Sequence, residues 1–214
     1  MHKFKITLVI LVIFNGAVIS QEKRDIGVQL GGSYYVGDYN LGKPFYQPST
    51  ALGVIFKYNI NEFYTARLSA AYGGLKGTYS SSQLFLPGLT RTFNKKLLEF
   101  ETMAEFNFLA FDTRQYKKQN FSPYFIMGLG FAYIGNQIIP HLPFGAGVKI
   151  SAGSRTAIRF EWRMHKTLTD SLDDYENLDD GTNAFLHNND WFSFVGLFLT
   201  YRLYNYGYTC PAYR

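Results

Sequence analysis

The sequence predicts an all-β protein, specifically an eight-stranded antiparallel transmembrane β-barrel of the outer membrane. The first observation is the alternation in residues 156–167, where every second residue is apolar and those between are charged or titratable. The apolar set is Ile158, Phe160, Trp162 and Met164, and the other set is Arg159, Glu161, Arg163 and His165. Period-two alternation places the two sets on opposite faces of one strand, as required when one face meets lipid and the other a polar lumen.

Two further observations extend this pattern to the whole chain. Seven other segments of about ten residues, the length of a tilted membrane strand, alternate in a similar way. Aromatic residues make up 18% of the 214 residues, which suits two interfacial girdles. After the N-terminus, no stretch reaches the roughly 18 apolar residues of a spanning helix, so membrane insertion would depend on strands.

The expected strands cover residues 25–35, 51–59, 64–73, 97–108, 123–133, 144–152, 156–167 and 191–203. Connections after the first, third, fifth and seventh strands are expected to be mostly long, with loops at residues 76–94 and 134–142. Short turns are expected at 59–62 and 153–154, whereas the link at 109–122 is longer than a typical periplasmic turn. This asymmetry is typical of outer-membrane barrels, and an even strand number places both termini on the periplasmic side.

A soluble secreted β-sandwich is the alternative fold, because it would also contain short strands. It would not explain an apolar, aromatic face on every strand opposite a face of mixed charge. The barrel is therefore favoured.

The N-terminus has the features of a secretory signal peptide at residues 1–20. Lys3 and Lys5 precede an apolar run at residues 6–14, and Val18 and Ser20 supply small residues before a cleavage site at Gln21. The apolar run is too short for the alternative, a membrane anchor. The barrel then covers residues 21–203 and a periplasmic tail residues 204–214. Loss of Lys3 and Lys5 lowers the formal charge from +5 to +3, too small a surplus to suggest nucleic acid.

The inward faces of the predicted strands carry a network of opposite charges. Its members are Arg67, Lys149, Arg159 and Arg163 against Glu99, Glu101, Glu105 and Glu161. An eight-stranded barrel is just wide enough for side chains to fill, so these charges are expected to pair and close the lumen. The alternative is an ion path, but an aqueous channel usually needs many more strands.

An acidic run follows the seventh strand and contains Asp170, Asp173, Asp174, Glu176, Asp179 and Asp180. Carboxylates are suitable Ca²⁺ ligands, but the run lacks EF-hand spacing. A solvated external loop is therefore preferred, with cation binding as the alternative.

No catalytic site is predicted, and no cofactor or small-molecule substrate is expected. After the signal peptide the histidines are His141, His165 and His187, and none belongs to a recognisable nucleophile motif. Cys210 is the single cysteine; in an oxidising periplasm it would be either a free thiol or an intermolecular disulfide.

Five short segments resemble one family in order along nearly the whole mature chain. They are GGSYYVGDYN at residues 31–40, EFNF at 105–108, SPY at 122–124, PFGAGVK at 143–149 and TDSLDD at 169–174. The chain resembles the PorG-like outer-membrane barrel proteins of the type IX secretion system. In the last segment, Thr169, Asp170, Leu172, Asp173 and Asp174 match the family's acidic loop motif, while Ser171 replaces its usual tyrosine. The resemblance implies an integral outer-membrane protein that associates with the periplasmic ring of the secretion and gliding machinery.

If such a ring is the partner, its contacts must lie on the periplasmic side. The link at 109–122 has a basic and aromatic composition that suits a protein contact, and the tail is rich in tyrosine. The predicted contact residues are Arg114, Tyr116, Lys117, Lys118, Cys210 and Tyr213. The alternative is that both segments are only solvated. General membrane integrity or surface adhesion remains the alternative function.

Overall fold

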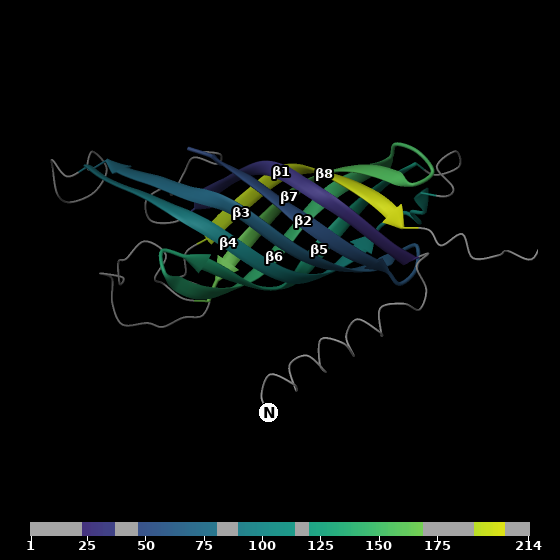
Figure 1. Ribbon diagram of the computed structural model, residues 1–214, viewed down its shortest axis with the longest axis horizontal. Helices are drawn as coiled ribbons and strands as arrows, with labels where there is room; N and C mark the ends of the chain where they lie inside the picture. Colours follow the sequence, from purple (N-terminus) through teal and green to yellow (C-terminus); the bar gives the residue numbers. More distant parts are fainter. Residues whose placement is uncertain (1–22, 37–46, 81–89, 114–119, 169–190, 204–214) are drawn as a thin grey trace, which may run out of the picture.

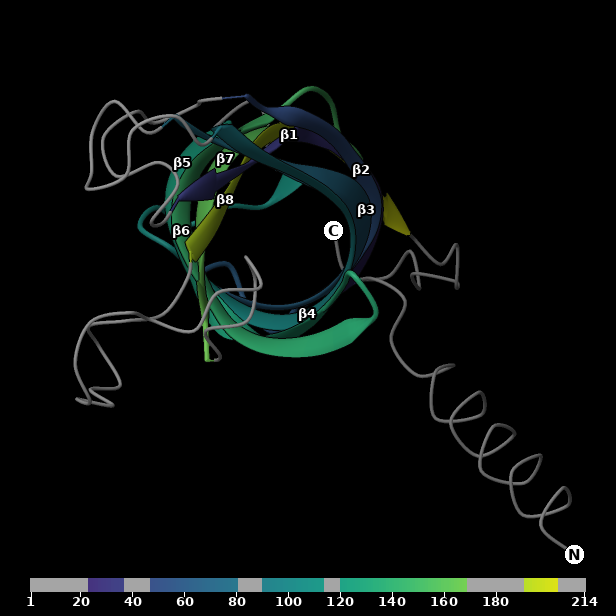
Figure 2. The same cartoon turned by 90° about the vertical axis from the view of Figure 1, so that its left-hand side faces the viewer.

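The chain forms a closed eight-stranded antiparallel β-barrel in the computed structural model, which describes residues 23–36, 47–80, 90–113, 120–168 and 191–203 (Figures 1 and 2). The strands are β1 (Arg24–Val36), β2 (Ser49–Asn59), β3 (Tyr64–Ser80), β4 (Thr90–Asn107), β5 (Phe121–Ile134), β6 (Gln137–Ser151), β7 (Thr156–Thr167) and β8 (Trp191–Leu203). Each strand pairs with its neighbours in sequence, and the pairing of β1 with β8 closes the ring. The predicted fold class is therefore confirmed.

The two-faced alternation of the strands matches the barrel geometry. In the middle of the wall, Leu30 of β1 pairs with Leu197 of β8, and both side chains are more than half exposed on the outside. Their neighbours Gln29 and Phe198 are buried inside. The expected inner and outer faces of β2 to β8 are observed in the same way. Tyr34 is at a position of β1 that alternation assigns to the outer face, but its side chain is buried.

An apolar belt surrounds the barrel. Its exposed side chains include Ile26, Val28, Leu52, Val54, Leu68, Phe100, Leu129, Phe131, Phe160, Leu197 and Leu199. Exposed aromatic residues gather near the end where β1 begins and β8 ends, hereafter the terminal end: Tyr58, Tyr64, Phe106, Phe121 and Tyr201. A soluble protein rarely exposes so large a continuous apolar surface. The belt and its aromatic rim fit a strand-built membrane protein.

The prediction of a loop at residues 134–142 is wrong. β5 continues to Ile134, a tight turn at Gly135 and Asn136 follows, and β6 begins at Gln137. Gly135 and Asn136 have φ angles of 54° and 79°, the left-handed conformation that both central residues of a type I′ hairpin turn need. Pro140 lacks an N–H and suggests a strand break, yet its carbonyl oxygen accepts a hydrogen bond from the Leu168 N–H at 2.9 Å. The connection after the fifth strand is therefore short.

The prediction of a loop at residues 76–94 is also largely wrong. β3 and β4 pair beyond Leu75 and Lys95 as far as Ser80 and Thr90, so only residues 81–89 lie between them. This hairpin extends past the other strands (Figure 1). The serines and lysines of residues 76–94 are typical of a loop. They can still form a strand, because the hydrogen bonds that pair two strands are made by the backbone and do not need apolar side chains.

The link that follows β4 begins by folding across the terminal end of the barrel. The Phe111 N–H donates a hydrogen bond to the Glu62 carbonyl at 3.2 Å, and Phe111, Asp112 and Thr113 are buried. Within the part of the chain that the structure describes, no helix is long and apolar enough to cross a membrane.

Candidate functional site: the charged interior of the barrel

The interior of the barrel is filled with charged side chains from most of the strands. Its cations are Lys57, Arg67, Lys149, Arg159, Arg163 and Arg202, and its anions are Asp25, Glu99, Glu101, Glu105, Asp112 and Glu161; all are buried. Among the lumenal residues that the structure describes, these six positive and six negative charges cancel when the histidines are neutral. Buried charges are tolerated only when they are paired, so the contacts between them decide what the interior does.

Glu105 is the centre of the first group of contacts. Lys57 Nζ lies 3.3 Å and Lys149 Nζ 2.8 Å from its Oε1 atom, while Arg159 Nη2 lies 2.5 Å from Oε2. Lys149 also donates a hydrogen bond to Asn107 Oδ1 at 2.5 Å. One carboxylate thus neutralises part of the charge of three cations from β2, β6 and β7.

Glu161 is the centre of the second group. Arg67 donates two parallel hydrogen bonds to it, at 2.7 and 2.6 Å, the bidentate geometry that matches guanidinium to carboxylate. The Tyr124 hydroxyl donates to Glu161 Oε2 at 2.5 Å, and Arg163 Nε lies 3.0 Å from Oε1. This network joins β3, β5 and β7 across the lumen.

Arg163 connects the second group to a third. Its Nη1 atom is ion-paired with Glu101 Oε2, and its Nη2 atom lies 3.2 Å from Gln29 Oε1 and 4.0 Å from Glu99 Oε1. His141 and His165 lie beside the same two glutamates. His141 was expected in a loop; it instead lies in β6 and is buried in the lumen.

Aromatic rings fill the space between the charges. The Arg163 and Arg67 guanidinium carbons lie 5.0 and 5.3 Å from the ring centres of Phe194 and Phe198. Arg159 lies 4.4 Å above the Tyr124 ring, and Lys149 Nζ lies 4.6 Å from the Phe111 ring. These separations are within the range of cation–π attraction, so the rings stabilise the cations that they cover.

Buried residues lie at both ends of this charged interior. At the terminal end, Arg202 binds Asp25 at 2.9 Å and Asp112 of the link at 2.5 Å, while Phe111 covers Lys149. Toward the opposite end lies an apolar cluster formed by Tyr35, Leu75, Leu97, Ala132, Ile134, Ile139 and Phe192. The described interior is therefore a packed, ion-paired core of a kind that resists ion passage.

The eight lumenal charges predicted from sequence all lie inside the barrel, and each contacts an opposite charge of the network. Sequence reasoning missed Lys57, Asp25 and Arg202, although each shares the inward parity of its strand. Asp112 lies in the link after β4, which is not a strand, so the alternation of side chains cannot predict which way it faces. The predicted contact residues Arg114, Tyr116, Lys117, Lys118, Cys210 and Tyr213, and the acidic motif at 169–174, lie outside the described residues.

We expect the purified barrel to show no discrete ion conductance in a planar lipid bilayer, because paired charges and aromatic rings fill its interior. The measurement is single-channel current at both voltage polarities, with a porin as positive control. Reproducible current steps from the folded, heat-modifiable species would contradict the plugged interior.

Comparisons with known proteins agree with this fold. The Neisserial surface protein A structure is similar with a TM-score of 0.52 and 13% identity, over 85% of this chain and 97% of that chain. Two outer-membrane structures from Pseudomonas aeruginosa are also similar. For the β-barrel domain of OprF the TM-score is 0.42 with 14% identity over 83% of this chain and 97% of that one. For OprG the TM-score is 0.45 with 11% identity over 85% and 97%.

At this low identity the likeness to Neisserial surface protein A concerns the fold alone, which is that of small outer-membrane β-barrels. No curated protein matches the sequence. A family model described as "Domain of unknown function (DUF6089)" matches residues 3–212, nearly the whole chain. The chain therefore belongs to the DUF6089 family of domains of unknown function.

Proposed function

We propose that the protein is a non-enzymatic integral component of the type IX protein secretion and gliding machinery in the outer membrane of a Gram-negative bacterium. The observation that supports it is the packed interior: a barrel whose lumen is filled by ion pairs acts through the surfaces at its ends and not as a conduit. The resemblance of the five ordered segments to PorG-like proteins supports the assignment to this machinery.

In this proposal the chain is exported by a signal peptide cleaved after residue 20, and its terminal end faces the periplasm. The link after β4 leaves the barrel at this same end, where Phe111 and Asp112 pack against the mouth. Its basic and aromatic residues Arg114, Tyr116, Lys117 and Lys118 would then contact the periplasmic ring. Cys210 and Tyr213 of the tail would add to this contact.

Two observations on the histidines support a non-enzymatic role. His141 and His165 are 1% and 0% exposed, so neither a lipid nor a peptide can reach them from outside. They face carboxylates and the Phe192 ring inside the barrel. A catalytic histidine must reach the reacting group of its substrate.

A general role in membrane integrity or surface adhesion is the second candidate. The specific observation that favours it is the long β3–β4 hairpin, which projects beyond the rim of the barrel (Figure 1). A segment that projects from a rigid scaffold is a common place for contact with an external ligand.

Deletion of the gene distinguishes these functions. Loss of secreted type IX cargo and of gliding, restored by the wild-type gene, is expected from the proposed role. Normal secretion with altered surface binding would favour adhesion, and a changed lipid A profile would favour a lipid-modifying enzyme; either result would contradict the proposal.

The contact residues are tested separately by truncation after Tyr204 and by charge reversal of Arg114, Lys117 and Lys118. Each variant is expected to insert normally, as judged by heat-modifiable migration, and to co-purify fewer ring proteins. If both variants retain the ring proteins, the contact does not lie in the link or the tail.

A further inference from the structure

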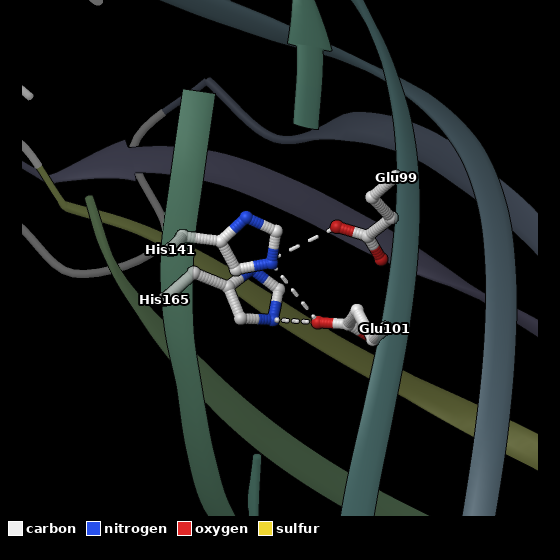
Figure 3. A group of neighbouring side chains, drawn as sticks. All are labelled: Glu99, Glu101, His141 and His165. Carbon is white, nitrogen blue, oxygen red and sulfur yellow. Dashed lines mark hydrogen bonds and ion pairs between the residues drawn. The ribbon is translucent and has the colours of Figure 1, made fainter. Parts of the chain in front are cut away.

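We propose that Glu99, Glu101, His141 and His165 form a binding site for one divalent transition-metal ion of the zinc type. The four side chains come from β4, β6 and β7 and converge in the lumen (Figure 3). One ligand atom from each lies within 4.8 Å of all the others. Imidazole nitrogen and carboxylate oxygen are ligands that Zn²⁺ accepts in four-coordinate sites. The site is independent of the proposed role in secretion.

The distances between ligand atoms fit a tetrahedral ion. His141 Nε2 and His165 Nε2 lie 3.4 and 3.2 Å from the same oxygen, Glu101 Oε1. For metal–ligand bonds of about 2.0–2.1 Å, the edge of a tetrahedron is about 3.3–3.4 Å. Glu99 is farther away. One ligand atom of its carboxylate lies within 4.8 Å of those of the other three residues, and its Oε2 lies 3.8 Å from the other nitrogen of His165, Nδ1, so the carboxylate would have to move toward the ion to bind it.

The hydrogen bonds of the two histidine rings leave a ring nitrogen available to bind an ion. Of the two nitrogens that would bind the ion, His165 Nε2 approaches Glu101 but has no hydrogen-bond partner among the described residues, whereas His141 Nε2 lies 3.4 Å from Glu101 Oε1. Both side chains are fully buried, so water at the surface does not satisfy these atoms. A buried polar atom without a hydrogen-bond partner lowers the stability of the fold. An ion bound by the lone pair of such a nitrogen would remove that loss of stability.

The local charge favours a cation. Arg163 contacts both Glu101 and Glu99, so two carboxylates face one guanidinium. Arg163 binds Glu101 through Oε2 and leaves Oε1 directed at the histidines. A hydrogen-bonding partner of this kind, which does not itself bind the ion, fixes the orientation of a metal-binding carboxylate.

The surrounding packing makes room for the cluster and holds its rings. A Cβ at Gly130 would lie 2.5 Å from His141 Nε2 and 3.0 Å from Glu101 Cγ, so only glycine leaves this space open. The Phe192 ring lies 4.2 Å from the His165 ring and 5.3 Å from the His141 ring, centre to centre. Because the apolar cluster containing Phe192 covers the site, the ion would enter during folding and would then connect β4, β6 and β7.

The test is metal retention after folding. The mature chain, without a polyhistidine tag, is folded from urea into detergent micelles with zinc chloride. It is then freed of loose metal by gel filtration in EDTA and analysed by mass spectrometry. We expect about one zinc per folded chain, and unfolding in urea slower by on the order of tenfold than for chain folded without metal.

Variants separate this site from incidental binding. His141→Asn and His165→Asn are expected to retain less than about a tenth of the wild-type zinc, because each removes a ligand. Gly130→Ala keeps all four ligands but displaces His141, and is expected to lose zinc as well. His187→Asn, which removes a histidine that is not one of the four proposed ligands, is the matched control and should retain the zinc. Heat-modifiable migration shows which variants are folded.

Wild-type protein alone also decides the question if the variants fail to fold. Folding with Co²⁺ should produce the visible absorption bands of a tetrahedral cobalt site. Folded wild-type protein without retained zinc and without these bands would overturn the proposal, as would equal zinc retention in the folded histidine variants.

Discussion

Replacing Glu105 with glutamine is expected to lower the free energy of unfolding by about 3–5 kcal/mol, the usual cost of breaking a buried ion pair. The reason is that Lys57, Lys149 and Arg159 all contact this one carboxylate. Glutamine has nearly the same shape but no charge, so three buried cations would lose their shared counter-ion. The measurement is equilibrium unfolding in urea of the barrel in lipid vesicles, followed by tryptophan fluorescence.

Ser69→Ala is the matched control for the Glu105 variant. Ser69 is buried in the same lumen, and its hydroxyl has no hydrogen-bond partner among the residues that the structure describes. Its removal is expected to change stability by no more than about 0.5 kcal/mol. If Glu105→Gln were as mild as this control, the charged interior would be solvated and not a packed, ion-paired core.

Replacing Leu197 with arginine is expected to destabilise the membrane-inserted barrel by about 2–4 kcal/mol, the cost of a lipid-facing arginine near the bilayer midplane. Leu197 lies in the middle of β8 opposite Leu30 of β1, and its side chain is 57% exposed on the outside. Urea unfolding in vesicles, compared with the wild-type barrel, measures the difference.

Leu168→Arg tests whether the cost depends on depth. Leu168 follows the last residue of β7 and is 38% exposed, so arginine there is expected to cost only about 0–1 kcal/mol. Equal effects at Leu168 and Leu197 would contradict the membrane position inferred from the apolar belt.

The sequence by itself determined which way most side chains face. Arg159, Glu161 and Arg163 alternate with Phe160 and Trp162, and the backbone of an extended strand turns successive side chains to opposite sides wherever the strand lies. The same alternation predicted the eight strands and the charged side chains that face the interior. It also applies to Lys57, which alternates with the exposed Phe56 and Tyr58 in β2 but was not predicted as a member of the network.

Strand ends depended on pairing that local composition does not reveal. Residues 134–142 were expected to form a loop, yet Gly135 and Asn136 form a two-residue turn and β6 continues through Pro140 and Pro143. The backbone ladder with β5 and β7 outweighs the breaker residues there, and the same ladder extends β3 and β4 past the expected loop boundary.

Only the tertiary structure decided which charges and rings meet. Arg67 and Glu161 are 94 residues apart, and Arg202 and Asp25 are 177 residues apart, yet each pair is in direct contact. His141 and His165 reach Glu101 from strands that do not pair with β4. Such contacts depend on the register, tilt and closure of the whole barrel, because these set the height of each inward side chain in the lumen, whereas alternation along one strand sets only its direction.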